Sequence, residues 1–375
     1  MVRVCHMTSA HGVEDDRVFH KECVSLAKAG YEVFEVAAGE CYDKNGVHII
    51  GVGDKPSSRL KRMTSFAKTV YKKALELNCD IYHFHDPELL PYGLKLKKKG
   101  KKVIFDSHEK YTYQLQNKPY LPKLVTRPMA AVYGLYEKHV LKIIDAVVFP
   151  CTMNGKNPFE GLCKKTPIIS NAAILDEFYN LYDTTVPKKE KQLCYVGGLT
   201  HSRGITADVQ AAAKANAILA LAGSFSPSEY EIKLRGMPEF SFVDYRGKLD
   251  RREVTDLLSE SRIGLCTLLD EGQYLHLDTF GIKVFEYMSM ALPVILSKSD
   301  YNCRMVDRYQ FGICVDPENV DEIAKAICYL LDNPDEAQRM GENGRRAVKE
   351  ELNWGIEEKK LLKLYEEIYK YDIEK

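Results

Sequence analysis

The sequence lacks the features that would place it among disulfide-stapled, zinc-stabilised or membrane-spanning proteins. None of its eleven cysteines forms a Cys-x-x-Cys pair or stands at a metal-type spacing from a histidine. A disulfide framework and a structural zinc site are therefore poorly supported, and we expect reduced thiols. No apolar run approaches the roughly 18–20 residues of a membrane helix, and the N-terminus has no apolar core of signal-peptide length. We therefore expect a cytoplasmic protein.

What the sequence does hold is the composition of an ordinary folded protein. Its 375 residues are 45% hydrophobic, 28% charged and 10% aromatic, which excludes disorder as the dominant state and predicts about two domains. The net charge is zero, but residues 51–150 carry 19 lysines and arginines against 9 aspartates and glutamates. This basic stretch either faces an anionic partner or consists of solvated helical faces, and both interpretations stay open.

Short apolar runs alternate with helical patterns along the chain, which predicts parallel sheets covered by helices. The expected strands are 2–7, 31–37, 81–85, 103–106 and 146–150, followed by 193–196, 217–222, 242–245, 263–267 and 294–297. We expect an N-terminal domain over 1–170, a C-terminal domain over 171–352 and an amphipathic helical segment over 353–375. In open α/β sheets ligands bind outside the carboxyl ends of the strands, so the residues after each strand are candidates for the site.

Glycine-rich turns follow three expected strands of the C-terminal half. The first turn contains Gly197, Gly198 and Arg203, and Gly223 and Gly247 follow the next two strands. Glycine lets a ligand approach the backbone, a helix N-terminus favours phosphate, and arginine matches phosphate oxygens. A Gly-Gly turn before a helix is more often plain turn chemistry, so this loop alone is a weak indication of a phosphate site.

Lys283 and Glu286 stand three residues apart at the start of an expected helix. On one helix face the lysine can meet a phosphate and the glutamate can accept hydrogen bonds from ribose. The alternative is a weak surface ion pair. The rest of this helix is apolar, which predicts burial, and buried charges need a partner or a ligand.

Six segments, in the right order, resemble glycosyltransferase family 4. IISNAAILDEF (168–178) is similar to the linker of that family, and YVGGLTHSRGI (195–205) to its glycine loop. LALAGSF (219–225) and VDYRGKLDRREVTDLL (243–258) are similar to its two strand–turn segments. FGIKVFEYMSMALPV (280–294) is similar to its donor-binding segment, and NWGIEEKKLLKLYEEI (353–368) to its closing helix. The resemblance implies an α/β GT-B fold, with two Rossmann-like, doubly wound parallel-sheet domains and a deep cleft between them.

The same resemblance implies roles for individual residues. Arg203 and Lys283 would hold the donor diphosphate, Glu286 the ribose, and the backbone around Lys248 and Leu249 the base. The implied donor-binding set is Gly12, Gly197, Gly198, Arg203, Gly223, Gly247, Lys248, Leu249, Phe280, Gly281, Ile282, Lys283 and Glu286.

Two positions depart from the family pattern. Asp278 stands eight residues before Glu286, where many members carry the first Glu of an E-x7-E pair that handles sugar hydroxyls. Gly198 stands where many members carry a phosphate-binding arginine. These departures leave open the role of Asp278 and the number of cationic contacts to the donor.

Polar residues also follow two expected strands of the N-terminal half. The segments HFHDPELL (83–90) and IFDSHEKY (104–111) resemble a second-site loop and the active-site histidine loop of the family. In related enzymes a histidine at the His108 position reaches the transferred sugar, so the implied catalytic set is His108, Lys283, Arg203 and Asp278. The expected acceptor-side residues are His11, His85, Asp86 and Glu109. His83 is expected to be a structural histidine.

The loop after the first strand has two interpretations. Gly12 lies where the family has a glycine loop near the diphosphate and the acceptor. Asp15, Asp16 and Arg17 either contribute to that site or cap and neutralise the following helix.

The basic stretch carries aromatic residues, which indicates a membrane surface. Its cations stand at 59, 61, 62, 68, 72, 73, 95, 97–99, 101 and 102, and Tyr111, Tyr113, Pro119, Tyr120 and Pro122 follow. Such a surface suits an anionic bilayer, so we expect peripheral contact with the inner leaflet of the cell membrane. Nucleic acid is the competing anion, but no nucleic-acid-binding signature is present and the isoelectric point is near 7.

We therefore predict a retaining glycosyltransferase that moves a sugar from a UDP- or GDP-linked donor to a glycan or lipid-linked acceptor, in cell-surface polysaccharide biosynthesis. No obvious nucleophile supports a double displacement, so Arg203, Lys283 and helix N-termini would stabilise the departing diphosphate. The sequence has no Asp-x-Asp pair, so neither a metal nor another cofactor is expected.

Three alternatives were weighed against this function. A nucleotide-sugar epimerase or hydrolase would share the donor chemistry, and a non-enzymatic nucleotide-sugar-binding scaffold would share the fold. Both alternatives stay open. A nicotinamide dehydrogenase is disfavoured because no Gly-x-Gly-x-x-Gly follows the first strand.

Overall fold

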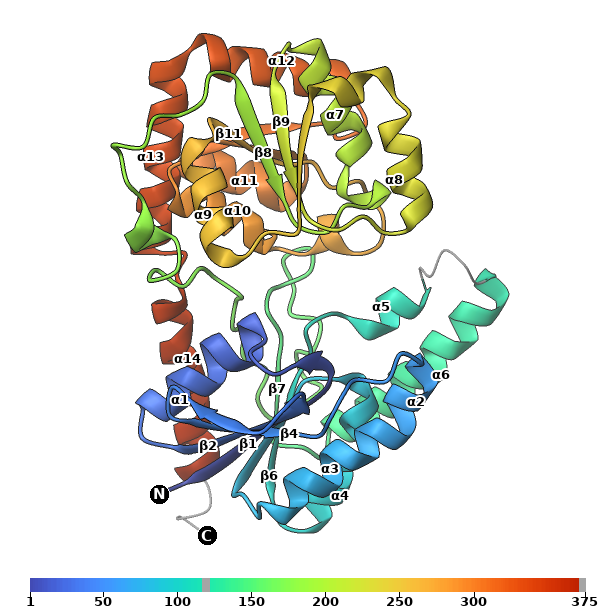
Figure 1. Cartoon of the computed structure of the whole chain (residues 1–375). Coiled ribbons are helices and arrows are strands. Elements are labelled where there is room, and N and C mark those ends of the chain that lie inside the picture. The colour runs from blue at the N-terminus through green and yellow to red at the C-terminus, as the bar shows by residue number, and fades with distance from the viewer. Residues whose placement is uncertain (117–121, 371–375) are drawn as a thin grey trace. The chain divides into compact units, whose positions relative to one another are not determined.

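The computed structural model describes residues 1–116 and 122–370. The chain forms two compact units (Figure 1): Met1–Asn171 together with the segment that begins at Gly355, and Ala172–Trp354. Each unit is built on a largely parallel sheet with helices on its faces, as in Rossmann-like domains. Pro119 and Tyr120 of the predicted aromatic surface, and 371–375 of the predicted tail segment, lie outside the described residues.

The first unit contains a seven-stranded sheet in the order β3-β4-β2-β1-β5-β6-β7, in which β3 alone is antiparallel to its neighbour. The strands are β1 (Arg3–Gly12), β2 (Glu32–Ala38), β3 (Tyr42–Lys44), β4 (Val47–Gly51), β5 (Ile81–Phe84), β6 (Lys102–Asp106) and β7 (Ala146–Val148). The helices are η1 (Asp16–Cys23), α1 (Val24–Lys28), α2 (Arg59–Lys61), η2 (Arg62–Phe66), α3 (Ala67–Glu76), η3 (Pro87–Leu89), α4 (Leu90–Lys98), α5 (Tyr111–Gln116) and α6 (Lys123–Leu141).

Strand β1 is longer than the sequence predicts, because a buried carboxylate holds its second half. Asp86 Oδ2 accepts hydrogen bonds from the backbone N–H of Ser9 (2.6 Å) and Ala10 (3.0 Å) and from the hydroxyl of Thr8 (2.8 Å). The chain order reverses between β1 and β5, and a ligand site is expected at such a switch point.

The second unit contains a six-stranded, all-parallel sheet in the order β10-β9-β8-β11-β12-β13. The strands are β8 (Gln192–Val196), β9 (Ile218–Ala222), β10 (Val243–Gly247), β11 (Ile263–Cys266), β12 (Val294–Ser297) and β13 (Gly312–Val315). The helices are η4 (Tyr179–Leu181), η5 (His201–Arg203), α7 (Ile205–Lys214), α8 (Ser228–Arg235), η6 (Pro238–Phe242), α9 (Arg251–Glu260), η7 (Tyr274–His276), α10 (Ile282–Ser289), α11 (Asp300–Tyr309), α12 (Val320–Asp332) and α13 (Pro334–Glu350). Here the order reverses between β8 and β11.

Both faces of the second sheet are buried along its inner strands, which explains why β9, β11 and β12 are largely continuous apolar runs rather than alternating ones, whereas the edge strand β10 carries Asp244 and Arg246 and is less buried. Along β9, Leu219 and Leu221 pack into the core on one face, and Ala220 and Ala222 pack into the core on the other. Fully burying a leucine stabilises the fold by roughly 1.5–3 kcal/mol. These two cores hold the carboxyl ends of β8, β9 and β10 in place.

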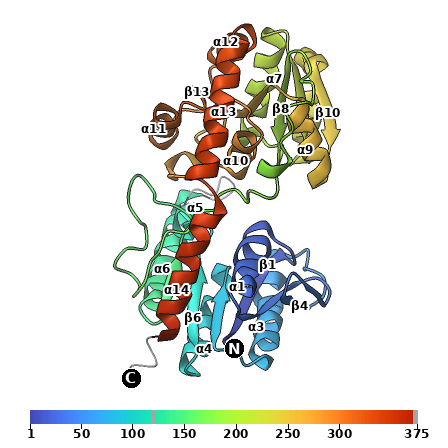
Figure 2. The ribbon, with the colours of Figure 1, turned by 90° about the vertical axis from the view of Figure 1, so that its left-hand side faces the viewer.

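The last helix, α14 (Trp354–Lys370), packs against the first unit (Figure 2). Tyr365, fully buried, places its hydroxyl 3.1 Å from His6 Nε2 and 2.9 Å from His83 Nδ1, and Lys165 pairs with Glu367 at 2.5 Å. Within the ranges 1–116 and 122–370, no helix has the length and apolar character needed to cross a bilayer.

Candidate active site

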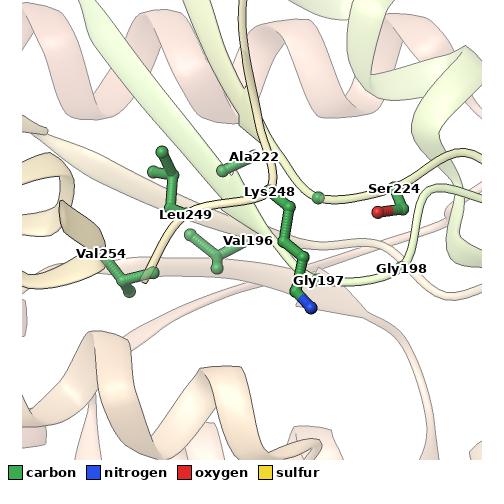
Figure 3. Close-up of a pocket in the computed structure, with 9 residues that line it drawn as sticks. Val196, Gly197, Gly198, Ala222, Ser224, Lys248, Leu249 and Val254 are labelled. Atoms are coloured by element: carbon green, nitrogen blue, oxygen red, sulfur yellow. The ribbon is translucent and has the colours of Figure 1, made fainter. Parts of the chain in front are cut away.

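A pocket of about 300 Å³ lies at the carboxyl ends of β8, β9 and β10 (Figure 3). Its lining residues are Val196, Gly197, Gly198, Ala222, Gly223, Ser224, Lys248, Leu249 and Val254. Apolar side chains gather toward one end of the pocket, and Lys248 and Ser224 lie toward the other. The pocket therefore brings together five predicted donor-binding residues, and its volume lies at the small end of the range for ligand sites.

At two glycines, one wall of the pocket consists of backbone atoms without side chains. Gly223 has φ +143°, and a Cβ there would lie 1.8 Å from the carbonyl oxygen of Gly197. Gly197 has φ +138°, and a Cβ there would lie 3.1 Å from Lys283 Nζ. Both φ values lie in a region that other residues rarely adopt. Gly247, at the end of β10, accepts the hydrogen bond of the Gly223 N–H at 2.7 Å.

Cationic side chains beside this wall rest on aromatic rings. Lys283 Nζ lies 3.6 Å from the centre of the Tyr195 ring, and the Arg203 guanidinium lies 4.7 Å from the centre of the Tyr274 ring. Among the residues that the structure describes, no carboxylate pairs with Lys283, Arg203 or Lys248. Burial, together with the charge of Arg203, lowers the pKa of Lys283 to about 8. An anionic ligand is the natural counter-charge for this group.

The start of α10 adds backbone donors to these cations. Gly281 is its N-cap and has no side chain to satisfy the free N–H groups of the first turn. Ile282 is partly exposed, whereas the ring of Phe280 packs against Phe285 in the core, so Phe280 offers a ligand only its backbone. The free N–H groups and the helix dipole favour an anion at this point.

Glu286 and Asp278 are held by arginines. Glu286 Oε1 accepts a hydrogen bond from Arg251 at 2.8 Å, and Arg251 also pairs with Glu177. No ion pair joins Lys283 to Glu286 in the part of the chain that the structure describes, so the surface-pair interpretation fails. Asp278 Oδ1 lies 3.5 Å from Arg304.

One buried acid of this unit was missed by the sequence reasoning. Asp208, on α7, is fully buried; its Oδ1 accepts a hydrogen bond from Thr267 at 2.6 Å, and its Oδ2 has no hydrogen-bond partner among the described residues. Burial raises the pKa of Asp208 to about 7, and its charge favours the protonated form of Lys283. The sequence does offer one indication of this residue, because Asp208 is the only acidic residue on an alanine-rich helix.

In the first unit, two partly exposed histidines lie side by side at the carboxyl ends of β1 and β6. The rings of His11 and His108 are 4.9 Å apart, and their side chains are 31% and 22% exposed. His11 Nδ1 lies 2.9 Å from Asp15 Oδ2. Burial alone would lower the pKa of His11, but Asp15 outweighs it and raises that pKa. Gly12 follows directly, and Glu109 is half-buried next to His108.

Beneath these histidines lies a buried ion-pair network. Arg17 Nε lies 2.7 Å from Asp106 Oδ2, and its terminal nitrogens reach Asp106 Oδ1 and Glu22 Oε1, both at 3.2 Å. Asp15 caps η1 by accepting from the N–H of Arg17 and Val18. The capping interpretation therefore holds for Asp15, whereas Arg17 points into the core and does not neutralise a helix end.

Two predicted acceptor-side residues are buried. His85 is 2% exposed, with Nδ1 3.2 Å from His108 Nε2, and Asp86 is fully engaged in holding the end of β1. Neither reaches the surface, so both position their neighbours. Burial lowers the pKa of His6, His83 and His85, which keeps these rings neutral near pH 7.

Comparison with known proteins identifies the family to which the chain is similar. Residues 182–347 match the profile of the glycosyl transferases group 1, and residues 16–156 match that of Glycosyltransferase Family 4. The chain is 30% identical over 109 residues to an MMP alpha-(1->4)-mannosyltransferase of Mycolicibacterium hassiacum, which is 28% of this chain and 24% of that one. It is 28% identical over 147 residues to a GDP-mannose-dependent monoacylated alpha-(1-6)-phosphatidylinositol monomannoside mannosyltransferase of Corynebacterium glutamicum, covering 39% and 38%. The chain thus matches less than half the length of these curated relatives.

The fold has close counterparts among solved structures. Sucrose-phosphate synthase of Thermosynechococcus elongatus superposes with a TM-score of 0.79 at 18% identity, over 99% of this chain and 100% of that one. This likeness shows the fold, in which two Rossmann-like domains form a GT-B enzyme scaffold. Together, the two profile matches and this architecture show that the chain belongs to the group 1 and family 4 glycosyltransferases of the GT-B fold.

Proposed function

We propose that this protein is a retaining glycosyltransferase that uses a UDP- or GDP-linked hexose as its donor. The observation that carries the proposal is the group of cations beside the glycine-walled pocket, Lys283, Arg203 and Lys248, with which no carboxylate of the described ranges pairs. Lys283 and Arg203 hold the diphosphate, the pocket receives the base, and Glu286 and Asp278 lie on the same unit for ribose and sugar hydroxyls. The mannosyltransferase names of the relatives support a hexose.

Charge stabilisation and positioning carry the reaction in this proposal. The bond between the anomeric carbon and the diphosphate breaks, an acceptor oxygen forms the new bond on the same face, and its proton goes to the departing phosphate. Lys283, Arg203 and the start of α10 stabilise the charge that develops on the diphosphate. His108, held by His85 and Asp106, contacts the transferred sugar and orients it.

The test of this function is donor-dependent transfer. Full-length protein is incubated with UDP- or GDP-linked glucose and mannose and with a lipid extract as acceptor, and both free nucleoside diphosphate and glycosylated lipid are quantified. His108→Ala is expected to reduce turnover by at least about tenfold while donor affinity changes little. His48→Ala, an exposed histidine paired with Asp43, is the matched control. Equal turnover in His108→Ala and wild type would move the reacting site elsewhere.

We further propose that the acceptor is lipid-linked and that α6 brings the protein to an anionic membrane. The exposed apolar side chains of α6 are Leu124, Val125, Met129, Val132, Leu135 and Tyr136. Their spacing places them on one side of the helix, and Leu124, Val132 and Leu135 are 89%, 69% and 72% exposed. Lys123, Arg127 and Lys138 are exposed on the same helix. An apolar stripe flanked by cations suits the surface of an anionic bilayer.

The membrane contact proposed for α6 differs in place from the contact that the lysine and arginine positions of the basic stretch predict. Several cations of that stretch are neutralised within the fold, because Arg62 pairs with Glu88, Lys97 with Asp145 and Lys73 with Glu76. The exposed stripe of α6 lies in the last third of the basic stretch, after the cations at 59–102. Apolar insertion therefore supplements electrostatic attraction in this proposal.

Co-sedimentation with vesicles of mixed anionic and zwitterionic lipid tests the membrane contact. Val132→Ser/Leu135→Ser is expected to release the protein from these vesicles, since it removes the most exposed apolar surface. Ile232→Ser, which changes an equally exposed residue on α8 (74%), is expected to leave binding unchanged. A wild-type protein that ignores anionic vesicles would refute this part of the proposal without affecting donor binding.

A further inference from the structure

A second group of side chains lies buried in the first unit, and only His85 among them has a part in the proposed transfer reaction, through its contact with His108. It consists of His6 on β1, Glu22 on η1, and His83 and His85 on β5, and their exposed fractions are 0%, 0%, 0% and 2%. Each offers one ligand-type nitrogen or oxygen, and these four atoms all lie within 4.8 Å of one another. We call this group the histidine–glutamate cluster.

The carboxylate of Glu22 lies opposite three imidazoles without bonding to them. Its Oε2 is 3.6 Å from His83 Nδ1, 3.8 Å from His6 Nδ1 and 4.0 Å from His85 Nε2, and it has no hydrogen-bond partner among the described residues. These distances exceed those of a hydrogen bond. Ligands of a four-coordinate Zn²⁺, each about 2.0–2.1 Å from the ion, lie roughly 3.3 Å apart. The distances from Glu22 to the three imidazoles would therefore have to shorten by roughly 0.3–0.7 Å to form a coordination sphere.

One guanidinium faces two carboxylates beside the cluster. Glu22 and Asp106 are fully buried, and Arg17 pairs with both. A buried carboxylate without a full counter-charge is costly, and either a proton or a cation on Glu22 offsets this cost. Burial and the charge of Asp106 raise the pKa of Glu22, which favours the proton when no cation is bound. Three neutral imidazoles and one carboxylate form a donor set that suits a divalent transition metal.

The outer contacts of two of the histidines match those of metal ligands, which typically donate their second ring N–H to an oxygen. His85 Nδ1 lies 3.4 Å from Asp106 Oδ2, and its Nε2 faces the centre of the cluster. His6 Nε2 lies 3.1 Å from Tyr365 Oη, and its Nδ1 faces the centre. These two inward nitrogens lie 3.0 Å apart and share a hydrogen bond, which a bound ion would replace. His83 Nδ1 also contacts Tyr365 Oη at 2.9 Å and would exchange this hydrogen bond for the ion, while its Nε2 has no partner among the described residues.

We propose that His6, Glu22, His83 and His85 bind one divalent first-row transition metal ion, with Zn²⁺ as the first candidate. The site is enclosed on all sides, so it has a structural role: the ion joins β1, η1 and β5 and, through Tyr365, anchors α14. It also fixes the ring of His85, whose Nδ1 then holds its proton toward Asp106 beside His108. Sequence spacing was not enough to indicate this site, because only His83 and His85 stand close together, while His6 and Glu22 lie more than 60 residues away from them.

Metal retention by the full-length, tag-free protein tests the proposal. The protein is loaded with ZnCl₂, dialysed against metal-free buffer, and analysed by inductively coupled plasma mass spectrometry. Wild type is expected to retain one ion per chain. Glu22→Gln and His83→Gln are expected to retain none, and Tyr365→Phe is expected to bind about 10–100-fold more weakly because only an outer contact is lost. His48→Gln, which removes an exposed histidine, is the matched control and is expected to retain the ion.

A second measurement decides the question even where a ligand variant fails to fold. Wild-type protein is loaded with Co²⁺, and its visible absorption and its thermal midpoint are compared with those of the EDTA-dialysed protein. The proposal predicts the intense visible bands of four-coordinate Co²⁺ and a higher midpoint with metal. The weak spectrum of six-coordinate Co²⁺ would overturn the proposal. Absence of retained metal would also overturn it and would assign a proton to Glu22 instead. Equal retention in a folded Glu22→Gln protein would assign the ion to surface histidines.

Discussion

The cationic side chains near the carboxyl ends of the two sheets differ in whether carboxylates pair with them. In the second unit, Lys283 and Arg203 rest on aromatic rings beside a bare glycine wall, and no described carboxylate pairs with them. In the first unit, the buried Arg17 is paired with Asp106 and Glu22. The difference is the one the proposed function needs: cations without a described carboxylate partner are available to a donor in the second unit, whereas the cation of the first unit is engaged within the fold.

The sharpest way to break this comparison is to remove the buried cation of the first unit. Arg17→Leu leaves Asp106 and Glu22 without their partner in the core, and we expect it to destabilise the protein by about 3–5 kcal/mol. Urea unfolding measures the loss. Arg235→Leu, which removes an exposed arginine paired with Glu231 on α8, is expected to change stability little. Similar effects of the two substitutions would contradict a structural role for the Arg17 network.

The corresponding substitution in the second unit should affect ligand binding rather than stability. Lys283→Ala removes a charge-assisted hydrogen bond to the diphosphate, so nucleoside diphosphate affinity should fall by about 1.5–3 kcal/mol. Isothermal titration calorimetry gives the affinity, and urea unfolding confirms that the variant is folded. Lys233→Ala, an exposed lysine on α8, should bind as wild type does. Wild-type affinity in a folded Lys283→Ala protein would remove Lys283 from the donor site.

The pKa of Lys283, about 8, makes donor binding sensitive to pH. Burial lowers this pKa most, Arg203 lowers it further through its charge, and Cys266, Glu286 and Asp208 raise it. The diphosphate prefers the protonated lysine, so affinity is greatest about one pH unit or more below 8 and falls as the pH rises through 8. Between pH 7.5 and 9 we expect a loss of roughly eightfold, because the charged fraction falls by that factor. Lys283→Arg, which stays charged, should bind equally at both pH values; a loss as large as that of wild type would contradict the assignment.

Asp208 should have the smallest effect, because it acts on the ligand through Lys283. Asp208→Asn keeps an acceptor for Thr267 but removes the negative charge that favours protonated Lys283. The pH midpoint of nucleoside diphosphate binding should move to lower pH, with a loss of less than about 1 kcal/mol in affinity at pH 8. Asp335→Asn, an exposed residue on α13, is the control. An unchanged midpoint would show that Asp208 has only a packing role.

The sequence locates the glycines of the pocket because their signals are local. Gly197, Gly198 and Gly223 follow their strands directly and line one pocket, and Lys283 stands in the first turn of its helix. Their assignment to the donor came from the family resemblance and stays a prediction. The resemblance also assigned Phe280 to the donor site, and the structure buries its ring in the core, because a motif does not reveal which way a side chain points.

The first unit was harder to predict because its contacts are long-range. Tyr365 meets His83 and His6 across 282 and 359 residues of sequence, and Arg17 meets Asp106 across 89. No spacing rule joins such distant positions. His85 and Asp86 were expected on the acceptor side because they follow a strand, yet packing buries both, and their hydrogen bonds serve His108 and β1 instead.

The most direct test of the central claim is calorimetric titration of the wild-type protein with UDP, GDP, ADP and CMP, each without and with Mg²⁺. The account predicts that a nucleoside diphosphate binds at one site per chain without added metal, with one base preferred over the others, and that Lys283→Ala weakens this binding. Absence of binding by every nucleotide, or binding that is unchanged in a folded Lys283→Ala protein, would contradict the assignment of the second unit as the donor site.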